Sequence, residues 1–241
     1  MLIKTSGIVR RTKKYSESSI IADVFTEAKG LRSYIIGGVR SKKSKVSAGL
    51  LQIMSLVDIV AYHRDDRDLT RLKEIKPLHV YQSIPFDMAK SAVGMLMTEV
   101  ARKTIRGHEE HPELFKFLLE NFLYLDETGN PIANLHLHFL LNLTEFFGFL
   151  PSDGFNDGTP FFDLQEGGFC PVRPDHPHWL GPELGEKFSQ LLHLPKEQSQ
   201  DVKMNREQRR NLLHHLLDYY RLHIENFPNI NSLEILEEVM G

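Results

Sequence analysis

The hydrophobic pattern of the chain changes its period once, between two prolines. Up to Pro77, short segments rich in β-branched and aromatic residues alternate with polar turns, which is the pattern of β-strands. From Phe86, just beyond Pro85, apolar residues recur at spacings of three and four, which is the period of amphipathic helices. The switch predicts two domains of α+β class, a β-rich one over residues 1–80 and a helical one over residues 81–241.

Five segments of the first part are predicted to be strands. They cover Leu2–Arg10, Ser19–Phe25, Leu31–Gly37, Leu50–Tyr62 and Leu69–Lys76. The second and third are joined by a short loop that ends in a glycine, as in a hairpin. The fourth is long and its apolar residues change face partway, which predicts a bend at a barrel corner. Five such strands are typical of a small closed barrel, most often an OB-fold, with an SH3-like barrel as the alternative.

The second part is predicted to be helical around an ordered insert. One helix is expected to begin with Asn130 as its N-cap and Pro131 at its first position, and another to begin with a capping box of Asn205 and Gln208. Residues 149–182 are rich in Pro, Gly and aromatic residues, which favours an ordered loop packed on the helices. The helices are expected over Met88–Val100, Glu113–Leu125, residues 130–148, Pro182–Leu194, Asn205–Glu225 and a short segment after Asn231.

The charge of the chain is divided unevenly between the two parts. Residues 1–80 carry a net charge of +8 and residues 81–241 a net charge of −11, which gives the overall −3. Such asymmetry indicates that the basic part meets a polyanion.

The basic residues of the first part fall at the end of the first predicted strand, on the third strand and in the loop after it. In a barrel, these places can converge on one face, where Lys and Arg contact phosphates and tyrosines stack on unpaired bases. The alternative interpretation is a solvated surface that only keeps the protein soluble. The predicted nucleic-acid-binding residues are Arg10, Arg11, Lys13, Lys14, Tyr15, Arg32, Tyr34, Arg40, Lys42, Lys43 and Lys45.

Several other classes of protein are disfavoured. The single cysteine, Cys170, permits neither an internal disulfide nor an all-cysteine metal site, and it favours a reducing, cytoplasmic location. No apolar run is long enough to cross a membrane, and polar residues begin too early for a signal peptide. The sequence has no phosphate-binding loop, dinucleotide fingerprint or nucleophile elbow, so we expect no enzyme and no cofactor.

Two groups of residues invite a metal site. His136 and His138 stand two apart in a predicted helix, so they point in nearly opposite directions and cannot share one ion. Three aspartates, Asp65, Asp66 and Asp68, are interleaved with arginines at a predicted hairpin tip. A solvated turn is the favoured interpretation, and a Mg²⁺-dependent nuclease is the alternative.

Several N-terminal segments, taken together, resemble the RecO family of bacterial DNA-repair and recombination mediators. The C-terminal runs Tyr219–His223 and Asn231–Leu236 also look like that family's end. The N-terminal segments that carry the resemblance are Gly7–Thr12, Tyr15–Ser18, Phe25–Gly30, Gly37–Lys45 and Leu50–Gln52.

The resemblance implies an N-terminal OB-fold and an all-helical C-terminal domain in a cytoplasmic, nucleoid-associated protein. It implies binding to single- and double-stranded DNA, and annealing of strands coated by single-stranded-DNA-binding protein. It also implies loading of the RecA recombinase together with the partner RecR, without nucleotide hydrolysis. From the residues alone, an RNA-binding accessory factor for translation or ribosome assembly remains the alternative for the same barrel.

The chain departs from the family in one place. Many relatives hold zinc with two C-x-x-C knuckles in the insert, but here Arg173 stands where a cysteine of the second knuckle would be, and residues 155–158 replace the first. One thiol cannot hold structural zinc. We therefore predict a degenerate, zinc-free loop held by aromatic packing of Phe161, Phe162, Phe169 and Trp179.

The helical part is expected to dock the acidic, apolar-ended tail of single-stranded-DNA-binding protein. Such a tail needs a hydrophobic pocket with cations at its rim. The candidates for this rim are Arg102, Lys103 and Arg106, or Arg206, Arg209 and Arg210. For each of them the alternative is an exposed helix face.

Overall fold

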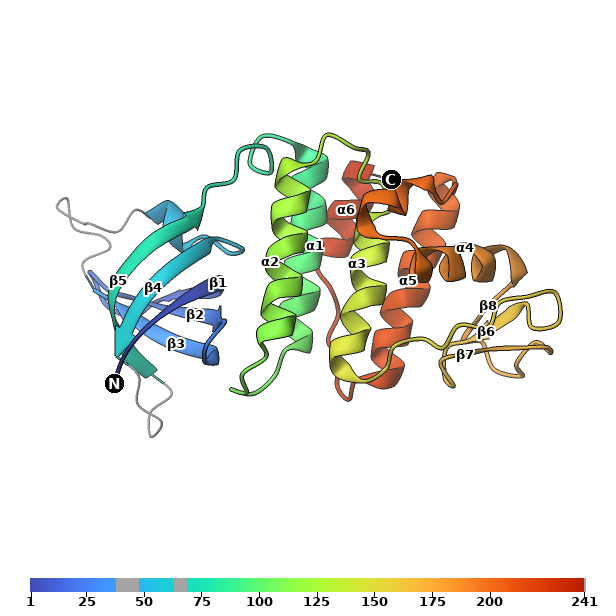
Figure 1. Cartoon of the computed structure of the whole chain (residues 1–241), viewed down its shortest axis with the longest axis horizontal. Helices are drawn as coiled ribbons and strands as arrows, with labels where there is room; N and C mark the ends of the chain where they lie inside the picture. Colours follow the sequence, from blue (N-terminus) through green and yellow to red (C-terminus); the bar gives the residue numbers. More distant parts are fainter. Residues whose placement is uncertain (38–47, 63–68, 241) are drawn as a thin grey trace. The chain divides into compact units, whose positions relative to one another are not determined.

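The computed structural model describes residues 1–37, 48–62 and 69–240. The chain forms two compact units that alternate along the sequence (Figure 1). The first contains Met1–Phe86 together with Ile105–Glu127, and the second contains Asp87–Thr104 together with Thr128–Gly241.

The strands of the first unit close into a barrel. They are β1 (Leu2–Lys14), β2 (Ile20–Thr26), β3 (Gly30–Ile36), β4 (Leu56–Tyr62) and β5 (Leu69–His79). Their order around the barrel is β1-β2-β3-β5-β4, with β4 paired back to β1, and only the β3–β5 pair is parallel. The predicted OB-fold followed by helices is thereby confirmed.

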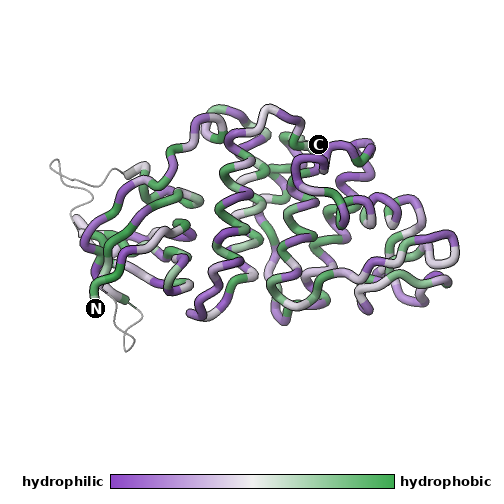
Figure 2. Tube along the Cα trace, in the orientation of Figure 1, coloured by the Kyte–Doolittle hydropathy of each residue, from purple (hydrophilic) through white to green (hydrophobic). Residues whose placement is uncertain are grey.

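The barrel strands carry both hydrophobic and hydrophilic residues (Figure 2). Inward-pointing side chains such as Val9, Val24 and Ile59 are at most 1% exposed and form the barrel core. Because the side-chain period of a strand is two, the neighbours of a core residue point to the outer face, where some of them, such as Ile8 and Phe25, are covered as well.

The first strand runs further than predicted, to Lys14, and contains a β-bulge. The register of β1 against β2 shifts between Val9 and Arg11, and pairing then continues to Lys14. The extra residue, Arg10, is 8% exposed and its Nη2 donates to the carbonyl of Ile105 at 3.3 Å.

The predicted strand Leu50–Tyr62 was wrong over its first half. Residues Ala48–Leu51 form a short 3₁₀ helix, η1, and Met54 follows with a φ of 76°. The N–H of Met54 donates to the carbonyl of Val9 at 2.8 Å, and the N–H of Val9 donates to Ser55. The change of face in the sequence therefore marks a tight turn against the bulge, and β4 begins only after it.

A buried carboxylate ties the end of helix α2 (Pro112–Glu127) to the segment that leaves the barrel. Asp126 accepts hydrogen bonds from the N–H groups of Gln82, Ser83 and Ile84 at 2.8–3.0 Å, and its Oδ2 lies 2.9 Å from Nε2 of His79. Its side chain is 1% exposed. Burial alone would raise the pKa of Asp126, but these hydrogen bonds outweigh it and hold the pKa well below its ordinary value.

Helices make up most of the second unit. They are α1 (Met88–Thr104), α3 (Leu135–Leu143), α4 (Pro182–His193), α5 (Arg206–His223) and α6 (Ser232–Met240), with 3₁₀ helices η2 (Thr144–Phe147) and η3 (Lys196–Asp201). Within the described ranges, no helix is long and apolar enough to cross a membrane.

The predicted start of one helix was confirmed and that of another was wrong. Asn205 and Gln208 form the predicted capping box of α5, with bonds of 2.8 and 2.9 Å. Helix α3, however, begins at Leu135 rather than at Pro131. The side-chain amide of Asn134 donates to the carbonyls of Ser199 and Val202, so tertiary contacts fix this start.

The insert, which was predicted to be an ordered loop, contains a small antiparallel sheet. Strands β6 (Phe161–Asp163), β7 (Gly168–Cys170) and β8 (Trp179–Leu180) pair in the order β7-β6-β8 (Figure 1). Phe162 is fully buried, and its ring centre lies 4.3 Å from that of Phe188 on α4. Aromatic packing therefore holds the sheet on the helices.

The Asp126 tie generates a stability prediction. We expect Asp126→Ala to lower the free energy of unfolding by about 3 kcal/mol, because three buried N–H groups lose a charged acceptor. The folded pKa is depressed, so the stabilisation is present above the ordinary carboxylate pKa of about 4 and is lost as the pH falls below it. Urea unfolding at several pH values should show the deficit of the variant shrinking below about pH 4.

The control is Glu127→Ala at the neighbouring exposed position, which should unfold like the wild type. Equal stabilities of the Asp126 and Glu127 variants at neutral pH would contradict a structural role for the tie.

Candidate functional site

One row of outward side chains crosses four strands of the barrel. Lys13 of β1 pairs with Ile21 of β2, Ile21 pairs with Ile35 of β3, and Ile35 pairs with Arg71 of β5. The neighbouring row, which includes Tyr34, points into the core, so this row faces outward. With strands about 4.8 Å apart, the two cations lie about 14 Å apart along the sheet. Two isoleucines therefore form an apolar strip on the β2–β3 face, with an exposed cation at each end. We call these four residues, Lys13–Ile21–Ile35–Arg71, the cationic row.

A second outward row lies beside it and is partly neutralised. Nη2 of Arg11 is 2.7 Å from the Asp23 carboxylate, and the Ser33 hydroxyl donates to the same group at 2.6 Å. Burial alone would raise the pKa of Asp23, but the hydrogen bonds from Ser33 and Arg11 lower it. The side chain of Arg11 is 47% exposed and keeps donors for a ligand.

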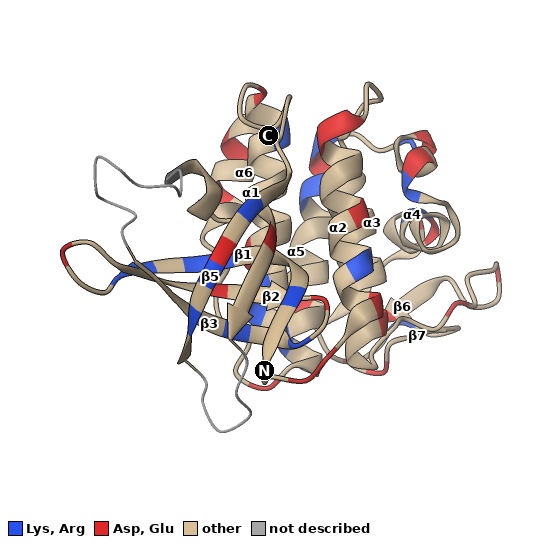
Figure 3. Cartoon of the chain, turned by 60° about the vertical axis from the view of Figure 1, so that its left-hand side comes forward, with Lys and Arg blue, Asp and Glu red and all other residues tan. Residues whose placement is uncertain are grey.

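The end of β1 contributes two more of the predicted residues. Lys14 is exposed, and Tyr15, the first residue after the strand, is 57% exposed. They begin the β1–β2 loop, which in OB-folds borders the nucleic-acid-binding face. Figure 3 shows Lys and Arg on several barrel strands rather than confined to one loop.

Three of the predicted residues do not present their side chains freely to a ligand. Tyr34 is 1% exposed within the barrel core, where burial raises its pKa to about 12, so its ring cannot stack on a base. Arg10 is buried beneath the carbonyl of Ile105. Arg32 is half-buried and donates to the carbonyl of Leu31. Tyr34 is unavailable because the strand register turns its side chain into the barrel core.

Some of the predictions fall on residues that the structure does not describe. These are the basic residues Arg40, Lys42, Lys43 and Lys45, and the aspartates Asp65, Asp66 and Asp68.

The structure offers an aromatic residue that the sequence analysis did not select. Tyr62, the last residue of β4, is 51% exposed and pairs with Leu2, which is 48% exposed. Because Ala61 pairs with Leu72 in an antiparallel arrangement, Tyr62 and Arg71 are neighbours across β4 and β5. Alternation from the buried Ala61 could have indicated an outward Tyr62, but its neighbour on β5 depends on register.

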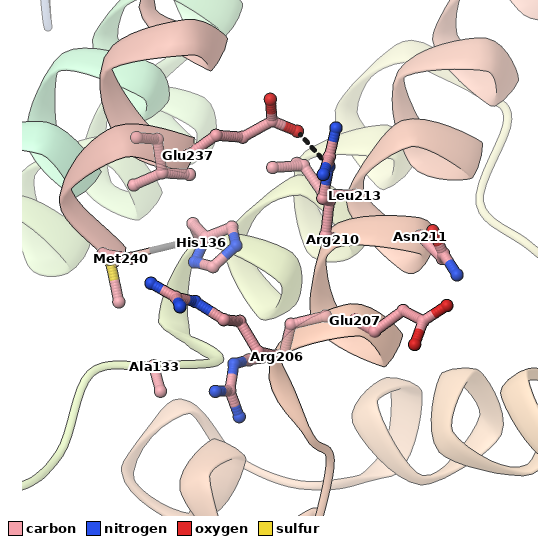
Figure 4. A pocket seen from close by; sticks show the side chains of 11 residues that line it. Ala133, His136, Arg206, Glu207, Arg210, Asn211, Leu213, Glu237 and Met240 are labelled. Carbon is pink, nitrogen blue, oxygen red and sulfur yellow. Dashed lines mark hydrogen bonds and ion pairs between the residues drawn. The ribbon is translucent and has the colours of Figure 1, made fainter.

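A separate pocket lies in the helical unit, between α5 and α6, and has a volume of about 560 Å³ (Figure 4). Its floor includes Leu213 and Leu236, each 2% exposed. The structure brings the second group of predicted rim residues together here, because Arg206, Arg209 and Arg210 all line this pocket.

The first group of rim residues is committed elsewhere. Nζ of Lys103 is 2.6 Å from the Glu99 carboxylate, donates to the carbonyl of Asn229, and belongs to a side chain only 12% exposed. Arg102 also pairs with Glu99, at 3.8 Å. Arg106 is exposed but belongs to the other compact unit. These cations do not line the pocket described above.

The insert does not fit a structural zinc ion. Sγ of Cys170 donates to the carbonyl of Val172 at 3.2 Å, and the Arg173 guanidinium stacks 4.5 Å from the ring centre of Trp179. Asn156 closes its turn by accepting from the N–H of Gly158. Structural zinc requires four Cys or His ligands, which are not supplied here. Nowhere in the described part of the chain do three His, Cys, Asp or Glu side chains gather as a metal site would need.

The buried histidines have structural surroundings. His136 is 4% exposed, and burial together with the charge of Arg209 lowers its pKa to about 3. Burial also lowers the pKa of His138, whose Nε2 lies 2.9 Å from the carbonyl of Leu194. The predicted opposite orientation of the two is consistent with these different partners.

Comparisons with known proteins cover both units. Residues 1–81 match a family model described as the N terminal part of recombination protein O, and residues 85–233 match its C terminal part. Three proteins called DNA repair protein RecO are similar over the whole chain. Those of Phocaeicola vulgatus and Christiangramia forsetii are 34% and 37% identical with 100% of both chains covered, and that of Bacteroides fragilis is 36% identical with 99% covered.

The insert generates a prediction about metal. We expect the purified protein to contain no stoichiometric zinc, and its thermal unfolding to be unchanged by a chelator, because side chains rather than a metal close the turns. Arg173→Ala should lower the free energy of unfolding by about 1 kcal/mol through loss of the Trp179 stacking. One zinc per chain in elemental analysis would contradict this.

The cationic row generates a prediction about DNA. Replacing Lys13 and Arg71 with Ala should reduce the slope of log affinity against log salt, measured with single-stranded DNA, by about 1.4, since each phosphate contact contributes about 0.7. Lys76→Ala is the matched control. Lys76 is also an exposed cation of β5, but it lies opposite Asp58 of β4 in the strand register and so outside the cationic row. An unchanged slope in the double variant would place the phosphate track elsewhere.

Proposed function

The chain belongs to the RecO family of DNA repair proteins, and from this premise we propose that it is a recombination mediator that acts by binding. It holds single- and double-stranded DNA on the barrel and anneals strands coated by single-stranded-DNA-binding protein. Together with RecR, it helps to load RecA. The cationic row on the OB barrel is the observation that carries the proposal.

Charge supplies most of the proposed binding. Lys13 and Arg71 meet phosphates at the two ends of the row, while Arg11 and Lys14 extend the positive surface along β1. With about six phosphate contacts on a single strand, raising the salt from 50 to 200 mM should weaken binding by a few hundredfold. Such contacts carry no sequence information, which suits a protein that acts on any broken chromosome.

Aromatic and apolar side chains add a preference for unpaired bases. Ile21 and Ile35 form the apolar strip between the cations, and Tyr15 and Tyr62 each expose more than half of their surface. A base stacked on an aromatic side chain contributes about 1–3 kcal/mol, and a paired base cannot reach it. The proposed face therefore favours a strand whose bases are still unpaired, which is the substrate of annealing.

The helical unit is proposed to recruit the protein to coated DNA. Single-stranded-DNA-binding protein ends in an acidic tail with apolar last residues, and the α5–α6 pocket combines an apolar floor with three arginines. Charge and apolar surface thus match at one place. The barrel then meets strands that the partner already holds.

An annealing assay tests the proposal. Complementary strands coated with single-stranded-DNA-binding protein should anneal faster with the wild-type protein than without it. A Lys13→Glu/Arg71→Glu variant should lose about tenfold or more of the acceleration, because two phosphate contacts become repulsive. The control Lys76→Glu should retain it, and a Lys42/Lys43/Lys45→Glu variant tests the basic loop predicted from the sequence.

Equal rates with and without wild-type protein would refute the proposed function. A normal rate from both charge-reversed variants would refute only the assigned residues. A parallel arm with RNA strands distinguishes the DNA mediator from an RNA-binding factor.

A further inference from the structure

A carboxylate of the chain itself occupies one arginine of the α5–α6 pocket. Oε1 of Glu237 on α6 lies 3.2 Å from Nε of Arg210 on α5, as the dashed line in Figure 4 marks. The same oxygen lies 2.6 Å from Nε2 of His214, one helical turn further along α5. The Glu237 side chain is 25% exposed, so it stands at the rim, between the pocket and the solvent.

The remainder of the pocket has groups that no part of the described chain satisfies. Nδ1 of His136, in a side chain that is 96% buried, has no hydrogen-bond partner among the described residues. Arg206 is exposed and makes no ion pair within the described ranges. By contrast, Arg209 is held by the carbonyl of Met204 at 2.6 Å. A buried orphan nitrogen and an open cation beside an apolar floor indicate a ligand with both an anionic and an apolar end.

We propose that Glu237 is an internal competitor of the α5–α6 pocket: in the free protein it pairs with Arg210, and the carboxylate of an acidic, apolar-ended peptide displaces it there on docking. This inference rests on the proposed docking of the partner's tail in the helical unit and adds a contact of the chain itself that regulates this docking.

The exchange is favourable because each group keeps a partner. When the incoming carboxylate takes Arg210, with Arg206 at its other side, Glu237 retains His214 at 2.6 Å and is not left as an isolated charge. His136 also lines the pocket, and its buried Nδ1, which has no partner among the described residues, adds a polar atom beside the apolar floor. The peptide's last side chain then lies against Leu213 and Leu236.

The internal competitor acts on one class of ligand only. A ligand with a neutral end would have to leave Arg210 with Glu237 and would gain only the apolar floor. A ligand with a free carboxylate replaces one ion pair by another and gains the floor as well. Glu237 therefore lowers the affinity for carboxylate-ended ligands, which must displace it from Arg210, and leaves the affinity for neutral-ended ligands almost unchanged.

Fluorescence anisotropy with two synthetic peptides tests this. Both are acidic and end in phenylalanine; one has a free C-terminal carboxylate and the other is amidated. The full-length wild-type protein should bind the free-acid peptide at least fivefold more tightly than the amide. Glu237→Gln should tighten the binding of the free-acid peptide by about three- to tenfold, because the competitor is gone.

Glu207→Gln is the matched control. It removes the same charge from the lining of the same pocket, but Glu207 is not the carboxylate that pairs with Arg210. This control should tighten binding by less than twofold. Thermal unfolding of both variants checks that α6 stays docked.

The peptide measurements distinguish the Glu237 competitor, the carboxylate site and tail docking from one another. Equal gains from the Glu237 and Glu207 variants, or no gain from either, would overturn the competitor while leaving tail docking intact. Equal affinities for the free acid and the amide would overturn the carboxylate site. Failure of both peptides to bind wild type and the Glu237 variant would overturn tail docking and this inference together, while the annealing assay would still judge the barrel separately.

Discussion

Strand register is the constraint on which the candidate DNA surface depends. In a closed barrel every outward residue is fixed by the inward residues beside it, and a slip of one position would exchange the two faces. The pairing Lys13–Ile21–Ile35–Arg71 exists because the adjacent inward row, with Tyr34, fills the core. The positive surface therefore results from strand pairing and does not follow from the clustering of lysines along the sequence.

The bulge at Arg10 shows how one local irregularity serves this register. It absorbs a residue of β1, so that the outward positions after it, Arg11 and Lys13, meet β2 in phase. The buried guanidinium of Arg10 donates a hydrogen bond to the carbonyl of Ile105 within the first unit. A residue that looks like part of a basic cluster in the sequence is thus structural, whereas its neighbours stay exposed.

Features that depend on local sequence could be predicted, whereas features that depend on contacts between distant segments could not. The period switch located the barrel and the helices, Gly30 with its φ of 59° marked the β2–β3 hairpin, and the capping box marked the start of α5. The turn at Met54 and the start of α3 depend on contacts with distant backbone, which one sequence does not reveal.

The residues of the candidate site show the same difference between local and non-local information. Basic residues in the first part could be recognised from charge alone, but the neighbours Arg71 and Tyr62 required register, and the inward Tyr34 could not be told from an outward one. The arginines of α5 could be recognised from the sequence because Arg206, Arg209 and Arg210 are spaced to share one face of a helix. The carboxylate opposite them comes from a helix that begins more than twenty residues later.

That helix, α6, is itself anchored by a largely buried acid on α1, Glu99. Glu99 accepts from the N–H and the hydroxyl of Ser232, both at 2.7 Å, and these bonds with the Lys103 pair hold its pKa at about 2 against the opposing effect of burial. Since an anion at a helix N-terminus also meets the positive end of the helix dipole, Glu99 fixes where α6 begins. The place of Glu237 at the pocket rim, little more than one turn further along, follows from that anchor. The charge of Lys103, which the sequence suggested was available to a partner, pairs with Glu99 and so helps to position α6 beside the pocket.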